Sequence, residues 1–154
     1  MDNGHWNFTH QMDDKSYFGF IYLIVNKTNG HAYIGRKQYR KAGKKRSKTY
    51  GHQNAWRNYK SSCKRLLADI KEFGKESFDF YCLMECEDRT DLYYWEVKLI
   101  MQYDALIHNN FYNDHAPDIY VLPKCLGIRK RKELIPTLIQ RSISCERKKR
   151  FRSS

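Results

Sequence analysis

Hydrophobic residues fall into runs whose spacing is typical of strands. The first run, Gly19 to Val25, has β-branched and aromatic residues on both faces, as expected of a strand covered on both sides. A more polar run from His31 to Gln38 follows, and Asn29-Gly30 between them is the dipeptide best able to adopt the positive φ angles of a tight hairpin turn. In a third run, Ser77 to Glu85, strict alternation places the apolar residues from Phe78 to Met84 on one side. We therefore predict a β-hairpin and a third strand.

An amphipathic helix is predicted between the hairpin and the third strand. Its apolar residues, from Leu66 to Phe73, have the spacing of one helical face. Ser61 or Ser62 is a suitable N-cap, and Gly74 is a stop signal.

A second helix is predicted after the third strand, with Asp88 or Thr90 as its N-cap. Its apolar stripe runs from Leu92 to Tyr103 through Trp95 and Leu99, and Glu96 falls on the same stripe. A carboxylate on an apolar face requires a cation, so its partner is either a Lys or Arg side chain or a metal ion. The order of elements predicts a small α+β domain, a three-stranded antiparallel sheet flanked by helices.

Charge is unevenly distributed along the chain, whose formal net charge is +12. Residues 36–65 include 12 basic and no acidic residues, residues 66–128 include 5 basic and 12 acidic, and residues 129–154 include 10 basic and 2 acidic. Such segregation favours a polyanionic partner, and nucleic acid is the one we expect. The sequence shows no long apolar run, signal peptide or basic amphipathic helix, which argues against a membrane.

The five cysteines form no CxxC pair, which argues against a zinc site and a disulfide framework and favours a reducing cytoplasm. Cys82 and Cys86 are expected to be buried on one face of the third strand.

The hairpin also carries candidate chemistry. Because the turn fixes the register, Tyr22 and Tyr33 are expected to lie near one another, together with Arg36. An arginine near a core costs free energy unless it binds an anion. Tyrosine is nevertheless an ordinary strand residue, so a packing role for each phenol stays open.

Two sequence segments resemble those of a known nuclease superfamily. Phe20-Ile21-Tyr22, followed eleven residues later by Tyr33-Ile34-Gly35, resembles the signature of the GIY-YIG nucleases, with Phe20 in place of the first Gly. The segment Trp56, Tyr59, Ser61, Ser62 and Lys64 resembles the W..Y.SS.K pattern of phage-encoded members. Glu96 and Asn113 fall where the family's metal-binding Glu and its late Asn are expected. The resemblance covers Tyr17 to Asn113.

This resemblance implies a phage-type, Mg²⁺-dependent (or Mn²⁺-dependent) DNA endonuclease in the cytoplasm of a bacterial host. It implies that Tyr22 is the general base or orients the attacking water, and that Tyr33 holds the attacking or transferring group. Arg36 would bind the scissile phosphate, Glu96 would be the metal ligand, and Asn113 would position the site.

Proton transfer in such a site raises a difficulty. An ordinary phenol, with a pKa of about 10, is a poor base at neutral pH, so nearby cations such as Arg36 or Lys64 are expected to favour the phenolate. His52 is a candidate auxiliary proton carrier.

Basic residues at the end of the hairpin, after it and at the start of the tail are candidate contacts to double-stranded DNA. They are Lys37, Arg40, Lys44, Lys45, Arg46, Lys48, Arg57, Lys60, Lys64, Arg129, Lys130, Arg131 and Lys132. The chain is accordingly divided into a leader or added edge segment (1–16), a GIY-YIG-like nuclease domain (17–126) and a basic C-terminal extension (127–154).

Two other functions compete with the nuclease. A catalytically inactive nucleic-acid-binding module is disfavoured because Tyr22, Tyr33, Arg36 and Glu96 are all present. An RNA-binding protein is disfavoured because the chain lacks an aromatic signature of the K/R-G-F-x-F kind.

Overall fold

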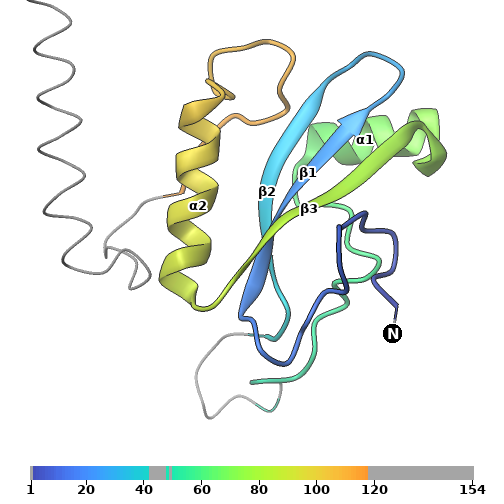
Figure 1. Ribbon diagram of the computed structural model, residues 1–154. Coiled ribbons are helices and arrows are strands. Elements are labelled where there is room, and N and C mark those ends of the chain that lie inside the picture. The colour runs from blue at the N-terminus through green and yellow to red at the C-terminus, as the bar shows by residue number, and fades with distance from the viewer. Residues whose placement is uncertain (1, 42–47, 49, 118–154) are drawn as a thin grey trace, which may run out of the picture. The chain divides into compact units, whose positions relative to one another are not determined.

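The three predicted strands form one antiparallel sheet in the computed structural model, which describes residues 2–41, 48 and 50–117. The elements are β1 (Gly19–Asn26), β2 (Ala32–Gln38), α1 (Lys64–Phe73), the 3₁₀ turn η1 (Lys75–Ser77), β3 (Phe78–Cys86) and α2 (Arg89–Gln102). The strand order is β2-β1-β3, so β1 is central and β2 and β3 are the outer strands (Figure 1). This confirms the predicted α+β fold.

The two helices cover opposite faces of the sheet, and alternation along β1 explains why. Phe20, Tyr22 and Ile24 pack in one core cluster with Leu66 and Ile70 of α1. The residue between the first two of these, Ile21, packs in a second cluster with Leu92 and Ile100 of α2. Because β1 is buried on both faces, its sequence is apolar at nearly every position.

The hairpin loop is longer than the predicted two-residue turn. Asn26 and His31 close it, with the Asn26 N–H donating to the His31 carbonyl at 2.8 Å, and Gly30 alone of the predicted dipeptide has a positive φ, 74°. The side chains of Asn26 and Asn29 accept the backbone N–H groups of Thr28 and His31, each at 2.9 Å. These side-chain turns stabilise a four-residue loop in place of a tight one.

A β-bulge changes which β3 side chains face each helix. Ile21 pairs with Met84 but Tyr22 pairs with Cys82, so one β3 residue is skipped. Cys82 therefore packs in the α1 cluster and Cys86 in the α2 cluster. The prediction that both cysteines share a face was wrong, because an inserted residue reverses the alternation beyond it.

Both helices begin close to their predicted positions. The N-cap of α1 is Cys63, one residue after the predicted serines, while Ser61 accepts the Cys63 N–H at 2.9 Å. Gly74 ends α1 with φ 80°, as predicted. Asp88 caps α2 by accepting the N–H groups of residues 90 and 91 at 2.7 and 2.9 Å.

The buried stripe of α2 differs at its end from the predicted one. Leu92, Glu96 and Ile100 are buried, whereas Tyr103 is the C-cap and is 53% exposed. Within the described residues, none of the helices combines the length and the apolar character needed to cross a bilayer.

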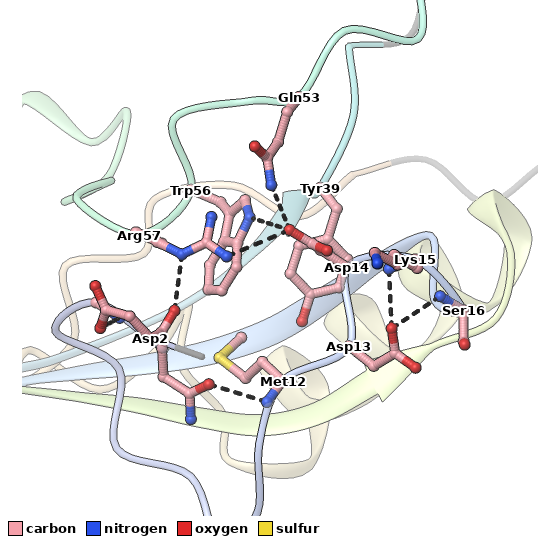
Figure 2. Close-up of polar contacts among 12 residues, drawn as sticks. Asp2, Met12, Asp13, Asp14, Lys15, Ser16, Tyr39, Gln53, Trp56 and Arg57 are labelled. Atoms are coloured by element: carbon pink, nitrogen blue, oxygen red, sulfur yellow. Dashed lines mark hydrogen bonds and ion pairs between the residues drawn. The ribbon is translucent and has the colours of Figure 1, made fainter.

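The N-terminal segment is an added edge of the sheet. The Asn7 N–H donates to the Phe80 carbonyl at 2.8 Å and the Asn7 carbonyl accepts from Cys82 at 2.9 Å, beside β3. Asp14 accepts hydrogen bonds from Gln53 and from Trp56 Nε1, and its carboxylate lies 3.5 Å from the Arg57 guanidinium (Figure 2). These contacts attach the segment to the chain between the hairpin and α1.

Candidate active site

Five of the six predicted catalytic residues line one polar cavity at the outer edge of β2. The cavity has a volume of about 170 Å³. Its lining residues are Tyr22, Tyr33, Arg36, Ser62, Glu96, Ile100, Asn113, His115 and Pro117. They come from β1, β2, α2, the segment before α1 and the segment after α2.

Tyr22 reaches this edge although it lies on the central strand. Its cross-strand partner is Gly35, and a Cβ built there would lie 2.5 Å from Tyr22 Oη and 2.7 Å from Tyr33 Cε1. The Tyr22 ring therefore occupies the space of the missing side chain, with its centroid 6.1 Å from that of Tyr33. This places the two phenols side by side, as the hairpin register predicts.

Arg36 enters the cavity from the opposite face of the sheet. It pairs with Ile21, on the face covered by α2, and its Nη1 donates to Glu96 Oε2 in an ion pair. Its guanidinium carbon also lies 3.7 Å from the centroid of the Tyr93 ring. Side chains from both faces can meet here because β2 is an outer strand.

Asn113 closes the edge of β2. Its Oδ1 accepts the Ile34 N–H at 3.0 Å and its Nδ2 donates to the Ile34 carbonyl at 2.8 Å, so the side-chain amide replaces a neighbouring strand. Just before it, the Tyr112 N–H donates to the Ala32 carbonyl at 2.8 Å. Both polar groups of a buried amide are therefore satisfied by the strand that carries Tyr33 and Arg36.

The phenols of the cavity do not have the lowered pKa values expected from nearby cations. Burial raises the pKa of Tyr22 well above its ordinary value and that of Tyr33 to about 12. A hydrogen bond with Ser61 opposes this rise only in part. Because the guanidinium of Arg36 is paired with Glu96, it does not compensate for the burial of the phenols.

Among the residues that line this cavity, Glu96 carries the carboxylate. Its side chain is 9% exposed, and the described part of the chain has no group of three or more His, Cys, Asp or Glu placed to hold an ion. A single carboxylate in a polar cavity suits Mg²⁺, which keeps several waters and is commonly bound through one or two carboxylates and substrate phosphates. Glu96 would thus serve such an ion as its one protein ligand.

His52 is not brought to the cavity. It is exposed, and its backbone carbonyl accepts from the Lys41 N–H at 2.8 Å beside the isolated bridge of Arg40 with Gln53.

The predicted nucleic-acid contacts that the structure describes come from several segments of the chain. Lys64 starts α1, and Lys37 is half-buried with its Nζ 3.7 Å from the centroid of the Tyr59 ring. Arg57 is paired with Asp14, which reduces its availability to a phosphate. Lys48 and Lys60 are exposed. Lys44, Lys45, Arg46 and Arg129, Lys130, Arg131 and Lys132 lie outside the described residues, as does the predicted extension (127–154).

Sequence reasoning did not assign roles to Ser62, His115, Ile100 or Pro117. Ser62 was part of the W..Y.SS.K segment, but the pattern alone gave it no role. The signal that identifies His115 is its position two residues after Asn113, which holds the edge of β2.

Comparison with known families is consistent with this geometry. The model of the family described as "Putative endonuclease segE, GIY-YIG domain" matches residues 5–116. No curated protein and no solved structure matches the chain significantly. The matched region includes all the strands, both helices and the cavity residues from Tyr22 to His115. The chain therefore belongs to the segE GIY-YIG domain family, a family of nuclease-type hydrolases whose substrate is nucleic acid.

Proposed function

We propose that the chain is a Mg²⁺-dependent endonuclease that hydrolyses phosphodiester bonds in double-stranded DNA. The observation that carries this proposal is the convergence of Tyr22, Tyr33, Arg36 and Glu96 on one polar cavity at the β2 edge of the sheet. Phosphodiester hydrolysis needs an oriented water, a counterion for the developing negative charge and help for the leaving oxygen.

Each requirement has a candidate group in the cavity. Tyr22 is the general base or orients the attacking water, and Tyr33 beside it holds the attacking or transferring group. The Arg36 guanidinium binds the scissile phosphate through its fork of N–H donors. Glu96 would hold Mg²⁺ (or Mn²⁺), which when bound supplies positive charge for the leaving 3′ oxygen.

The proposal is tested by incubating the full chain with supercoiled plasmid, with and without Mg²⁺, and resolving nicked and linear products on one gel. Cleavage that requires the metal is the expected result. Tyr22→Phe keeps the ring but removes the hydroxyl, and Arg36→Lys keeps the charge but removes the fork. Each is expected to lose about 10²-fold or more in rate.

Tyr103→Phe is the matched control, since Tyr103 is an exposed phenol at the end of α2 and its loss should leave the rate unchanged. Retardation of the plasmid without cleavage would favour an inactive DNA-binding module. Cleavage of RNA in place of DNA would overturn the substrate assignment.

A further inference from the structure

The guanidinium of Arg36 has a second contact, on α2, that the proposed mechanism does not use. Its carbon lies over the face of the Tyr93 ring, 3.7 Å from the ring centroid. A cation in this position is attracted by the negative charge of the ring face. The cavity lining includes Arg36 and Glu96 but, among the described residues, not Tyr93. Tyr93 therefore contacts a residue of the site without lining the space that a substrate would enter.

Tyr93 and Glu96 hold Arg36 in different ways. They are three residues apart on α2, so their side chains are neighbours on the helix surface. Glu96 Oε2 accepts a hydrogen bond from Arg36 Nη1, which occupies a donor. The ring holds the guanidinium through its face, which leaves the N–H groups to bind oxygen acceptors. Of the two contacts, the one with Glu96 thus competes with a phosphate.

The contact with Tyr93 gains importance when a metal ion binds. In the proposed function the Glu96 carboxylate holds that ion, and it then ceases to orient Arg36. A long side chain that loses its partner regains rotamers, and misplacement of a reacting group by about 1 Å can lower a rate about 10²-fold. The contact with the Tyr93 ring does not involve the carboxylate, so it persists through this exchange of partners.

The ring of Tyr93 is itself attached to its own helix. Arg89 Nη2, one turn earlier on α2, donates to Tyr93 Oη at 3.5 Å, and the Arg89 guanidinium carbon lies 5.3 Å from the ring centroid. The Tyr93 side chain is also partly buried. The position of the ring is therefore supported independently of Glu96.

We propose, on the basis of the proposed nuclease function, that Tyr93 is a positioning residue for the reaction. It holds the Arg36 guanidinium over its ring while Glu96 binds the metal ion and Arg36 binds the scissile phosphate. The face of the ring performs this role, and the hydroxyl has no part in it. Tyr93 acts through Arg36 and touches neither the phosphate nor the metal ion.

The test is single-turnover cleavage of a short DNA duplex by the full chain at saturating Mg²⁺. Tyr93→Leu removes the ring and keeps an apolar side chain that suits a helix, and it should lose about tenfold in rate. Duplex affinity in EDTA, measured by fluorescence anisotropy, should stay within about twofold, because Glu96 still holds Arg36 when no metal is bound.

Tyr93→Phe distinguishes the ring from the hydroxyl. The pKa of Tyr93 is lowered, first by the hydrogen bond from Arg89, which makes its hydroxyl a rival candidate for proton transfer. The Phe variant keeps the ring and should retain the rate. A loss as large as that of Tyr93→Leu would assign the role to the hydroxyl and overturn the proposal. Tyr94→Leu is the matched control, since it removes the next ring on α2, which lies beside Trp95, and should leave the rate unchanged.

A double-mutant cycle with Arg36→Ala tests whether Tyr93 acts through Arg36. If it does, adding Tyr93→Leu should slow the Arg36→Ala chain no further. Independent losses that multiply in the double variant would mean that Tyr93 only supports the fold, and would overturn the proposal. If circular dichroism shows that Tyr93→Leu does not fold, Tyr93→Gln takes its place with the same expected loss.

An unchanged rate in Tyr93→Leu would overturn the assignment while leaving the nuclease function standing. Absence of Mg²⁺-dependent cleavage by the unaltered chain would instead overturn the proposed function and this inference together.

Discussion

Arg36 and Glu96 neutralise each other in the cavity, although each is proposed to bind a different ligand. The phosphate of a substrate competes with Glu96 for Arg36, and a metal ion competes with Arg36 for Glu96. Phosphate that binds Arg36 releases Glu96 for the metal ion, and a metal ion that binds Glu96 releases Arg36 for the phosphate. Metal and DNA are therefore expected to bind with positive coupling, which by linkage is reciprocal.

Glu96→Gln tests this coupling at the level of one residue. Without a carboxylate at position 96, Arg36 is available to phosphate, so duplex affinity in the absence of metal should rise about fivefold or more while cleavage is lost. Fluorescence anisotropy in EDTA measures the affinity. Glu87→Gln removes the same charge from an exposed position and should not tighten binding to this extent.

The same variant separates a structural from a functional role of the pair. Because Glu96 and Arg36 are partly buried, their charged hydrogen bond should contribute about 1–3 kcal/mol to the free energy of unfolding. Equal duplex affinity in Glu96→Gln and the unaltered chain, combined with a loss of this size in urea unfolding, would mean that the pair only stabilises the fold.

Tyr33 provides a prediction for pH. Its pKa is about 12 in the folded chain, raised first by burial, against about 10 when unfolded. Between these values the unfolded chain binds fewer protons, so Tyr33 contributes stability that is complete below pH 10 and is lost as the pH rises toward 12. Tyr33→Phe should remove about 2 kcal/mol of this loss, measured by urea unfolding at pH 9 and pH 11.5.

Tyr103→Phe is the control for this pH effect, because its phenol is exposed at the end of α2. It should show the same dependence of unfolding free energy on pH as the unaltered chain. If Tyr33→Phe also matched the unaltered chain, the phenol of Tyr33 would not be desolvated in solution.

At the scale of the elements, the edge of β2 carries two of the cavity side chains, Tyr33 and Arg36. Gly35 makes room for the Tyr22 ring and Asn113 holds the backbone of Ile34. The strand thus presents Tyr33 from one face and Arg36 from the other at fixed positions. The contacts that hold this strand in place are therefore as important to the site as the side chains that it presents.

Gly35→Ala should disturb the site more than the fold. The new Cβ would lie 2.5–2.6 Å from the Tyr22 hydroxyl and its ring carbon, so the ring must shift. We expect overpacking to cost about 1–3 kcal/mol in unfolding free energy and displacement of Tyr22 to cost about 10²-fold in rate. Gly30→Asn is the control, since Gly30 has φ 74°, a conformation that Asn tolerates, and no atom lies within 4 Å of the position that a Cβ would take there.

Asn113→Ala should loosen the edge of β2. It leaves the Ile34 N–H and carbonyl without their partners, at a cost of about 2 kcal/mol in unfolding free energy. Amide hydrogen exchange should show faster exchange at Ile34, with slower cleavage in the same variant. Asn109→Ala, at an exposed position in the same segment, should leave both unchanged.

The elements were predictable where a local signal was strong. Alternation identified the three strands, and Gly74 and Asp88 marked helix ends through local backbone chemistry. The β-bulge was not predictable, because pairing between distant strands decides where a residue is skipped. The edge pairing of Asn7 was missed for the same reason, since its partner is β3, about seventy residues later.

The site was predictable to the extent that the hairpin register and the family pattern determine it. Tyr22 and Tyr33 were placed correctly because one turn connects their strands. Whether Glu96 faces a metal or an arginine was left open by its helix pattern, and the ion pair with Arg36 shows one of these partners. His115 had no pattern of its own, since its place depends on how the segment after α2 returns to β2.

At the scale of the whole molecule, the N-terminal segment connects the sheet to the chain that enters the site. Trp6 Nε1 donates to the Trp56 carbonyl at 2.8 Å, and the His5 N–H donates to the Arg57 carbonyl at 3.2 Å. This stretch continues through Tyr59 to Ser62 in the cavity. Hydrogen bonds of the N-terminal segment thus support the stretch of chain that leads to Ser62 on one side of the cavity.

The distribution of charge over the whole chain gives the last prediction. Residues 129–154, which lie outside the described residues, carry +8 of the net +12, whereas all the cavity residues precede position 118. Deleting the chain from Arg129 onward should therefore weaken duplex binding without altering the chemical step. Each Lys or Arg that neutralises a phosphate contributes about −0.9 to the slope of log affinity against log salt, so loss of four contacts should reduce the slope by about 3–4.

The truncated and full chains are compared by fluorescence anisotropy with a short duplex between 50 and about 200 mM salt, the range over which phosphate contacts dominate affinity. At saturating protein and low salt, the truncated chain should cleave at the rate of the full chain. An equal salt slope in both would assign the tail to solubility or to a protein contact. Failure of the truncated chain to fold, measured by circular dichroism, would instead mean that the apolar stretch from Leu134 to Gln140 belongs to the core.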